Sequence, residues 1–223
     1  MVRRRPAPGG GVIVEIPPAD LIGWINRFTG RNAGLADLSA QPDAVRLTAG
    51  DGTRASLAVP FPPMSVGHRE PVEALLDHLA GLGAMALVLV RGGAHSVGVA
   101  RHGVVVSSST RREYLQGRTA AGGWSQQRFA RRRGNQLTAS MEHAADVAAR
   151  VLLPVIDSLS TVVLAGDAGA LATVLADRRL ARLAALPSRT FGDIAEPRRE
   201  VLDEVAARAL TIDITVTSTG PRD

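Results

Sequence analysis

The sequence contains no cysteine and no lysine, and each absence restricts the chemistry open to the chain. Without cysteine, neither disulfide bonds nor thiolate metal sites can form. All 26 basic residues other than histidine are arginine, whose planar guanidinium makes paired hydrogen bonds to phosphate and stacks on bases. A GC-rich genome accounts for the general abundance of arginine, alanine and glycine. It does not account for arginine that is concentrated in one stretch.

Metal and nuclease chemistry is disfavoured by further absences. The five histidines form neither an i, i+4 pair nor a carboxylate-spaced ligand set: His68, His78, His95, His102 and His143. No Asp or Glu occurs between His78 and Arg112, so the strands predicted there lack the carboxylates that a two-metal nuclease needs. The dinucleotide, P-loop, GxSxG and HExxH motifs are also missing. We therefore expect no metal and no cofactor, and we interpret His95 and His102 as structural or surface residues.

Long hydrophobic runs are absent as well. The longest apolar runs, such as Met85 to Val90, are far too short to span a membrane. Arg3 to Arg5 opens the chain, but Pro6, Pro8 and the following glycines do not make a signal-peptide core. With 223 residues and 45% hydrophobic content, the chain can bury a sizeable core. We expect a soluble, cytoplasmic protein with no membrane partner.

One stretch carries the excess positive charge. Between Arg111 and Arg133 there are seven arginines and one acid, Glu113, whereas the whole chain has a net charge of +5. The small residues Thr119 to Gly123 have no apolar period, so they predict an exposed loop in which glycine permits positive φ and close backbone approach. We expect Ser125 to cap a short helix from Gln126 to about Arg133, and Gly134 to end it.

The short helix combines cations with uncharged polar groups. Arg128, Arg131 and Arg132 fall at i, i+3 and i+4 and form one cationic face, although at least one arginine of the group 131–133 is expected to be a solvated surface residue. Gln126 and Gln127 have no acid or base function near neutral pH. The sequence leaves two roles open for Trp124, as an anchor of the loop or as a ring that stacks on a nucleotide base.

The pattern GGxSQQRxxRRRxxQ, with GRTxxGG upstream, resembles the signature of the Vms-like release factor (VLRF) family in its actinobacterial type. That family is distantly related to the catalytic domain of the archaeal and eukaryotic class-I release factors. The match is dense over about twenty residues, and the order of elements suits it from about Ala86 to Val216. Class-I factors carry a contiguous Gly-Gly-Gln, whereas Trp124 and Ser125 separate Gly123 from Gln126 here.

The resemblance implies a ribosome-rescue peptidyl-tRNA hydrolase, which is a carboxylic ester hydrolase. It implies Gln126 as the catalytic residue, with Gln127 as the alternative if the register shifts by one, Ser125 beside them, and Gly122 and Gly123 as the loop hinge. The RNA contacts it implies are Arg118, Arg128, Arg131, Arg132, Arg133 and Trp124. Its implied partners are the large ribosomal subunit with its RNA and peptidyl-tRNA, without DNA. The alternatives are a non-catalytic ribosome or RNA-binding adaptor and a hydrolase that acts on free tRNA.

We predict an α/β (α+β) fold with three parts. Residues 1–10 are expected to form a disordered basic arm, 11–63 a small N-terminal α+β unit, and 64–223 the release-factor-like domain with the glycine and glutamine loop at 117–136. The expected mixed sheet of the last part contains a strand meander and packed helices. Its strands are 86–90, 96–101, 103–108, 161–165, 190–194 and 211–216, and its helices include 71–82, 138–159, 180–186 and 198–210. In the turn Gly166–Gly169 we expect Asp167 to cap a helix rather than bind phosphate.

Residues 11–63 are predicted to contain a strand at 12–16, a helix at 19–28 and a hairpin of 44–48 with 54–59. Leu21, Ile22, Trp24, Ile25 and Phe28 should face inward. The segment is close to neutral, and nothing in it resembles a second nucleic-acid site. A compact chain of this length has a radius of gyration of about 17 Å, which is small against a whole tRNA. We therefore expect peptide release that does not depend on a codon.

Overall fold

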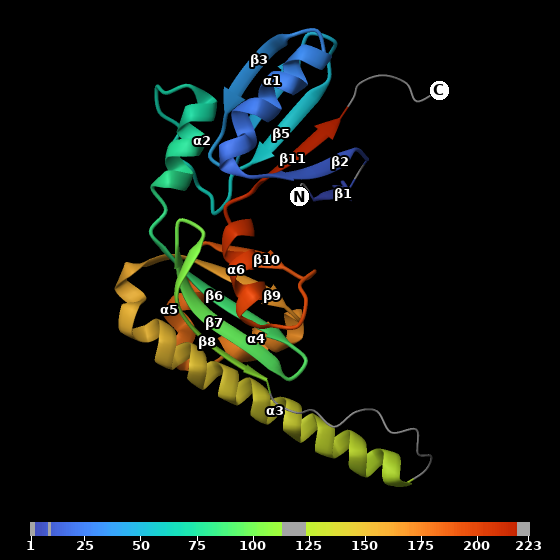
Figure 1. Cartoon of the computed structure of the whole chain (residues 1–223), viewed down its shortest axis with the longest axis vertical. Helices are drawn as coiled ribbons and strands as arrows, with labels where there is room; N and C mark the ends of the chain where they lie inside the picture. Colours follow the sequence, from blue (N-terminus) through green and yellow to red (C-terminus); the bar gives the residue numbers. More distant parts are fainter. Residues whose placement is uncertain (1–2, 9, 113–123, 218–223) are drawn as a thin grey trace. The chain divides into compact units, whose positions relative to one another are not determined.

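The computed structural model describes residues 3–8, 10–112 and 124–217, but not the side chains of residues 124–135 (Figure 1). The chain divides into two compact units. Unit 1 consists of residues 1–82 together with 208–223, and unit 2 consists of residues 83–207. Each unit has a sheet and a hydrophobic core of its own.

Unit 1 contains a six-stranded antiparallel sheet with the order β1-β2-β11-β5-β4-β3. Its strands are β1 (Arg4–Pro6), β2 (Val12–Ile16), β3 (Leu35–Ala40), β4 (Ala44–Ala49), β5 (Arg54–Ala58) and β11 (Ile212–Thr217). The helices α1 (Leu21–Arg31) and α2 (Pro71–Ala80) pack into one common core with this sheet, and a 3₁₀ turn, η1 (Pro18–Asp20), precedes α1. The core includes Leu57, Leu75 and Ile214, because alternate residues of each strand face the helices.

The opposite side of the unit 1 sheet holds a buried ion pair. Nε and Nη2 of Arg208 donate to the two carboxylate oxygens of Glu15, at 2.8 and 2.7 Å. Both residues are less than 10% exposed. Arg5 also donates to Glu15, at 2.8 Å, and to Asp213, at 2.7 Å. Since buried charges require partners, these contacts neutralise the two carboxylates within the fold.

Unit 2 contains a five-stranded mixed sheet with the order β10-β9-β6-β7-β8. Its strands are β6 (Ala84–Arg91), β7 (Ala94–Arg101), β8 (Val104–Arg112), β9 (Leu159–Gly166) and β10 (Ser188–Phe191). Strands β6, β7 and β8 form an antiparallel meander, whereas β6, β9 and β10 are parallel. The predicted meander and the α/β (α+β) fold class are therefore confirmed.

Helices cover both faces of the unit 2 sheet (Figure 1). The elements are α3 (Trp124–Leu152), α4 (Ala168–Leu175), α5 (Ala181–Ala184) and α6 (Arg199–Arg208), with 3₁₀ turns η2 (Leu153–Ser158) and η3 (Arg178–Leu180). Residues of α3 and α4 share a core with Val97, while α6 lies against the other face of β7. There a Cβ on Gly98 would come within 2.7 Å of the Ser107 carbonyl oxygen and 2.9 Å of the Leu202 side chain, so the close approach of backbone and α6 at this point favours glycine.

The observed unit boundaries differ from the predicted ones. Residues 4–6 form strand β1 rather than a disordered arm. The break expected at 60–63 lies inside unit 1, because Phe61 and Met64 are buried at 3% exposure. Helix α2, expected to belong to the second part, packs into the unit 1 core, and β11 joins the unit 1 sheet between β2 and β5. The unit boundaries depend on strand pairing and core packing between segments that are distant in the sequence. A local sequence pattern does not contain this information.

Other sequence expectations are corrected at the level of single elements. The helix expected over 138–159 ends at Leu152, where Pro154 favours the 3₁₀ turn η2. Strand β3 was not predicted, because Leu35–Ala40 is mostly exposed and has no clear alternation. Ile22, expected to face inward, is 51% exposed. The carboxylate of Asp167 does not cap α4 but accepts a hydrogen bond from the backbone N–H of Gly92, at 2.9 Å.

Candidate functional site

The residues predicted to form the site follow β8 and begin α3, both in unit 2. Gly122, Gly123 and Arg118 lie outside the described residues. Trp124, Ser125, Gln126 and Gln127 occupy the first turn of α3. The structure therefore places Trp124 and Ser125 in a helix, whereas Ser125 was expected as the residue that caps one.

Helix α3 is continuous through Gly134, so the prediction that this glycine ends a short helix is wrong. A glycine inside a helix costs only about 1 kcal/mol relative to alanine. Once the packed part of a helix has formed, its extension through residues of good helix propensity is favourable. At 1.5 Å per residue, the 29 residues of α3 make a helix of about 44 Å.

The C-terminal half of α3 anchors the site to the sheet. Among residues with described side chains, the buried face begins at Ser140 and Met141 and continues to Leu152. Much of this face is alanine, which lets α3 approach β7 closely: Ala144, Ala145, Ala148 and Ala149. The spacing of residues 128, 131 and 132 places them on one face of the same helix. The arginine stretch is thus built on a helix whose other end is fixed in the core.

A salt-bridge network also holds α3. Arg179, in η3, donates to Asp146 of α3 at 2.6 Å and to Asp177 at 2.6 Å. The hydrogen bonds from the Arg179 side chain and backbone lower the pKa of Asp177 to about 2. The same carboxylates, Asp177 first, raise the pKa of Arg179.

Two histidines that the sequence alone did not connect lie close together in unit 2. His95 of β7 is fully buried, and its ring lies 5.4 Å from that of His143 on α3. Arg111, near the end of β8, donates to Nε2 of His143 at 3.2 Å. His95 is a buried residue. The strand register pairs it with Arg111, and this register cannot be read from the sequence alone.

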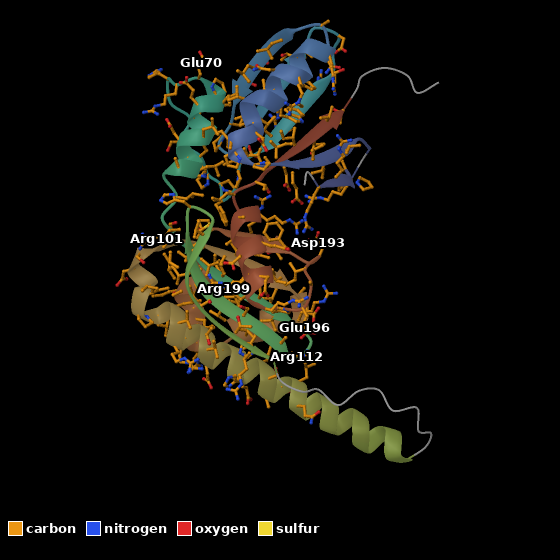
Figure 2. The ribbon with its side chains drawn as sticks, viewed as in Figure 1. Glu70, Arg101, Arg112, Asp193, Glu196 and Arg199 are labelled. Atoms are coloured by element: carbon orange, nitrogen blue, oxygen red, sulfur yellow. The ribbon has the colours of Figure 1, made fainter. Side chains whose placement is uncertain are left out.

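Two further cations lie on β8 and in the last turn of α3. Arg111 contacts His143, and Arg150 contacts Ser109. Within the described part of the chain neither arginine forms an ion pair. Other arginines of this region are neutralised, since Arg112 pairs with Glu196 at 2.9 Å (Figure 2). Arg199 pairs with Asp203 at 3.0 Å and also donates to Ser108, so it fastens α6 to β8. Arg111 and Arg150 are the functional candidates that the motif alone did not reveal.

The described ranges contain neither a metal-binding cluster nor a membrane-spanning helix. No group of three or more His, Asp or Glu side chains there is arranged to hold a metal ion. No helix in that part of the chain is long and apolar enough to cross a membrane.

Residues 83–215 match the family described as "Actinobacteria/chloroflexi VLRF1 release factor" (acVLRF1), and this range includes the whole of 117–136. No curated protein matches the chain significantly.

Among solved structures, the chain is similar to the Vms1 mitochondrial localization core, with 10% identity and a TM-score of 0.43 over 92% of this chain and 84% of that one. It is also similar to the archaeal translation termination factor aRF1, with 13% identity and a TM-score of 0.38 over 89% of this chain and 66% of that one. For Pelota of Archaeoglobus fulgidus the identity is 12% and the TM-score 0.31, over 93% and 66% of the two chains.

The family match extends over more than half of the chain and includes the whole of unit 2. It begins three residues before the range over which the sequence resembled the VLRF family and ends one residue before its end. The chain therefore belongs to the actinobacterial and chloroflexi family of VLRF1 release factors, and its function is release-factor-like and related to translation.

Proposed function

We propose that this protein hydrolyses the ester bond that links a nascent peptide to tRNA on the large ribosomal subunit. In this reaction water attacks the ester carbonyl, and the products are a peptide carboxylate and a tRNA with a free terminal hydroxyl. The observation that carries the proposal is the match of residues 83–215 to a release-factor family, because that range contains both glutamines and the arginine stretch.

Gln126 is the proposed catalytic residue, with Gln127 as the alternative. A glutamine amide cannot act as a general base, but it can orient water and stabilise negative charge that develops on the carbonyl oxygen. The position of both residues in the first turn of α3 supports this role. The N–H groups of a first helical turn have no partner within the helix, and the helix dipole favours an anion there. Gly122 and Gly123 would let the backbone approach the ester closely.

The proposed RNA contacts are the arginines of α3, extended by the neighbouring strand. Arg128, Arg131 and Arg132 share one helix face, with Arg118, Arg133 and Trp124 close in sequence. Arg111 and Arg150 add cations that no described acidic residue neutralises. Guanidinium groups at several positions suit a ligand with repeated phosphates, as ribosomal RNA and tRNA are.

The first test separates a hydrolase from an adaptor. Purified large subunits that carry radiolabelled peptidyl-tRNA are mixed with the protein, and bound protein and released peptide are measured in the same sample. The proposal predicts binding together with release well above the spontaneous rate. Binding without release would identify a non-catalytic adaptor. Release from free peptidyl-tRNA at an equal rate would contradict the need for the subunit.

A further inference from the structure

Unit 1 contains a pocket that combines aromatic rings with cations. Its volume is about 240 Å³, and aliphatic side chains of β2 form part of its wall. The remaining wall consists of Trp24, Phe28 and Asn32 with three arginines, Arg4, Arg27 and Arg31. None of the sequence expectations assigned a function to this place, because residues 11–63 are nearly neutral in total.

Two periodicities bring the pocket residues together. Positions 24, 27, 28 and 31 lie on one face of α1, since they are three and four residues apart. Arg4 pairs with Val14 across β1 and β2, so both side chains lie on the side of the sheet that faces α1. Arg5, the next residue, points to the opposite side and binds Glu15. Formation of strand β1 thus separates the neighbouring arginines and adds one of them to the pocket.

The aromatic wall is held together by contacts within α1. The rings of Trp24 and Phe28 are stacked, with centroids 5.3 Å apart and an angle of 10° between their planes. Phe28 is 6% exposed, whereas Trp24 is only partly buried. The side-chain amide of Asn32 donates to the carbonyl oxygen of Phe28 at 2.7 Å and fixes the end of α1. A planar ligand can therefore stack on the indole without reorganising the wall.

The pocket is also strongly positive. No acidic residue lines it, and Arg4, Arg27 and Arg31 form no ion pair with a residue that the structure describes. The nearby acids Glu15 and Asp213 lie on the other side of the sheet, where Arg5 and Arg208 bind them. The near-zero net charge of residues 11–63 therefore does not reveal that positive and negative side chains lie on different sides of the sheet.

We propose that this pocket binds a nucleotide of single-stranded RNA, with its base stacked on Trp24 and the flanking phosphates bound by Arg4, Arg27 and Arg31. Base stacking on an aromatic ring combined with a cationic surface is the general mode of sequence-tolerant binding to single strands. The volume suits one base and is smaller than typical pockets for whole small-molecule ligands. Three arginines exceed what one phosphate requires, which favours a strand over a free mononucleotide. This proposal stands independently of the hydrolytic activity in unit 2.

The test uses the fluorescence of Trp24 in the full chain. The chain has two tryptophans, so Trp124→Phe leaves Trp24 as the only indole. This protein is titrated with hexauridylate at several salt concentrations, beside Arg27→Gln/Arg31→Gln in the same background. The matched control combines Arg46→Gln with Arg54→Gln, because it loses the same charge and both residues are exposed arginines of unit 1 that do not line the pocket. Uridine monophosphate and hexaglutamate serve as comparison ligands.

The proposal predicts quenching of Trp24 by hexauridylate in the control. The Arg27→Gln/Arg31→Gln variant should bind at least tenfold more weakly, and its logarithmic salt slope should fall by about 1.4, which corresponds to two lost phosphate contacts on a single strand. Uridine monophosphate should bind at least tenfold more weakly than hexauridylate, and hexaglutamate should not displace the RNA.

Three results would overturn the proposal. The first is unchanged Trp24 emission when the protein is saturated with RNA, since the strand would then bind elsewhere. The second is equal affinity of the Arg27→Gln/Arg31→Gln variant and the Arg46→Gln/Arg54→Gln control. The third is binding of the monophosphate or of hexaglutamate as tight as that of the RNA. Because the readout needs no peptidyl-tRNA, failure of peptide release would leave these results unaffected.

Discussion

Arg4 and Arg5 are adjacent in the sequence, but they face opposite sides of the unit 1 sheet. At the scale of single residues, the sequence predicted the inward positions of Leu21 and Phe28, because helical period identifies them. It did not predict the partners of charged groups. Glu15 binds Arg208, 193 residues away, and no spacing rule reports such a contact.

The first prediction concerns this buried ion pair. Arg208→Met should lower the free energy of unfolding by about 3 kcal/mol, since removal of one partner leaves a buried carboxylate poorly compensated. Arg5 still donates to Glu15, so the loss should lie at the low end of the range for buried pairs. Urea unfolding followed by circular dichroism measures the change.

The matched control is Arg5→Gln, because the Arg5 side chain is 45% exposed. Exposed ion pairs contribute about 1 kcal/mol or less, so this variant should be nearly as stable as the wild type. An Arg208→Met protein as stable as Arg5→Gln would show that the buried pair contributes nothing to the fold.

The second prediction concerns Asp177, whose pKa is lowered to about 2 by hydrogen bonds from Arg179. A folded pKa below the unfolded value of about 3.9 means that the stabilisation is present above that value and is lost as pH falls through about 2. Carboxyl-carbon NMR titration should show the low pKa in the wild type and a return toward the ordinary value in Arg179→Ala. Arg178→Ala, the adjacent exposed arginine, should leave it unchanged. An ordinary pKa in the wild type would contradict the network.

At the scale of elements, the predictable part was the pattern inside each strand and helix. Alternation and turns located β2, the β4–β5 hairpin and the meander. The glycine rule failed at Gly134, because packing of Ser140–Leu152 stabilises α3 beyond what local propensity indicates. The two glutamines therefore lie in the first turn of a long helix rather than of a short one.

The third prediction concerns the arginine face of α3. Arg128→Gln, Arg131→Gln and Arg132→Gln together should weaken binding to large subunits and flatten its salt dependence, because each lost phosphate contact releases fewer counterions. If all three arginines contact duplex phosphates, the logarithmic slope should fall by about 2.7. Sedimentation binding across a salt series measures both quantities.

A triple Arg→Gln variant at Arg46, Arg54 and Arg69, which are exposed arginines of unit 1 outside its pocket, has the same change in net charge and serves as the control for general electrostatics. Equal slopes for the two triple variants would mean that the α3 face contributes no specific contact.

At the scale of the whole molecule, the sequence correctly predicted the fold class and family, because the motif at 117–136 is dense and unit 2 is one contiguous stretch of sequence. Unit 1 was less predictable. Its sheet includes β11, which comes from the other end of the chain and lies between β2 and β5. Its cationic pocket includes Arg4 from β1. Nothing in a sum of charges over residues 11–63 reveals such a pocket.

The fourth prediction is that peptide release does not depend on a codon. Reading a codon requires contacts to the base edges of three nucleotides. The pocket of unit 1 offers an indole face and arginines, which suit base faces and phosphates and tolerate any sequence. Release rates should be similar for ribosomes stalled on sense and on stop codons, and isolated large subunits should be at least as good a substrate. Release confined to stop-codon complexes would refute this account.

The fifth prediction concerns the glutamine at the start of α3. In single-turnover release from large subunits with peptidyl-tRNA, Gln126→Ala should lower the rate constant by about 100-fold or more, as loss of an oxyanion-stabilising donor does. Binding should be nearly unchanged, because the residue acts on the transition state. Gln136→Ala, in the same helix and nearly three turns after Gln126, should release at the wild-type rate.

The most direct test of the central claim is therefore the release rate constant of Gln126→Ala measured beside wild type, Gln127→Ala and Gln136→Ala on the same subunits. The account predicts loss of release in Gln126→Ala with retained binding. Loss only in Gln127→Ala would move the catalytic assignment by one residue. Wild-type release by both Gln126→Ala and Gln127→Ala would contradict hydrolysis by this site.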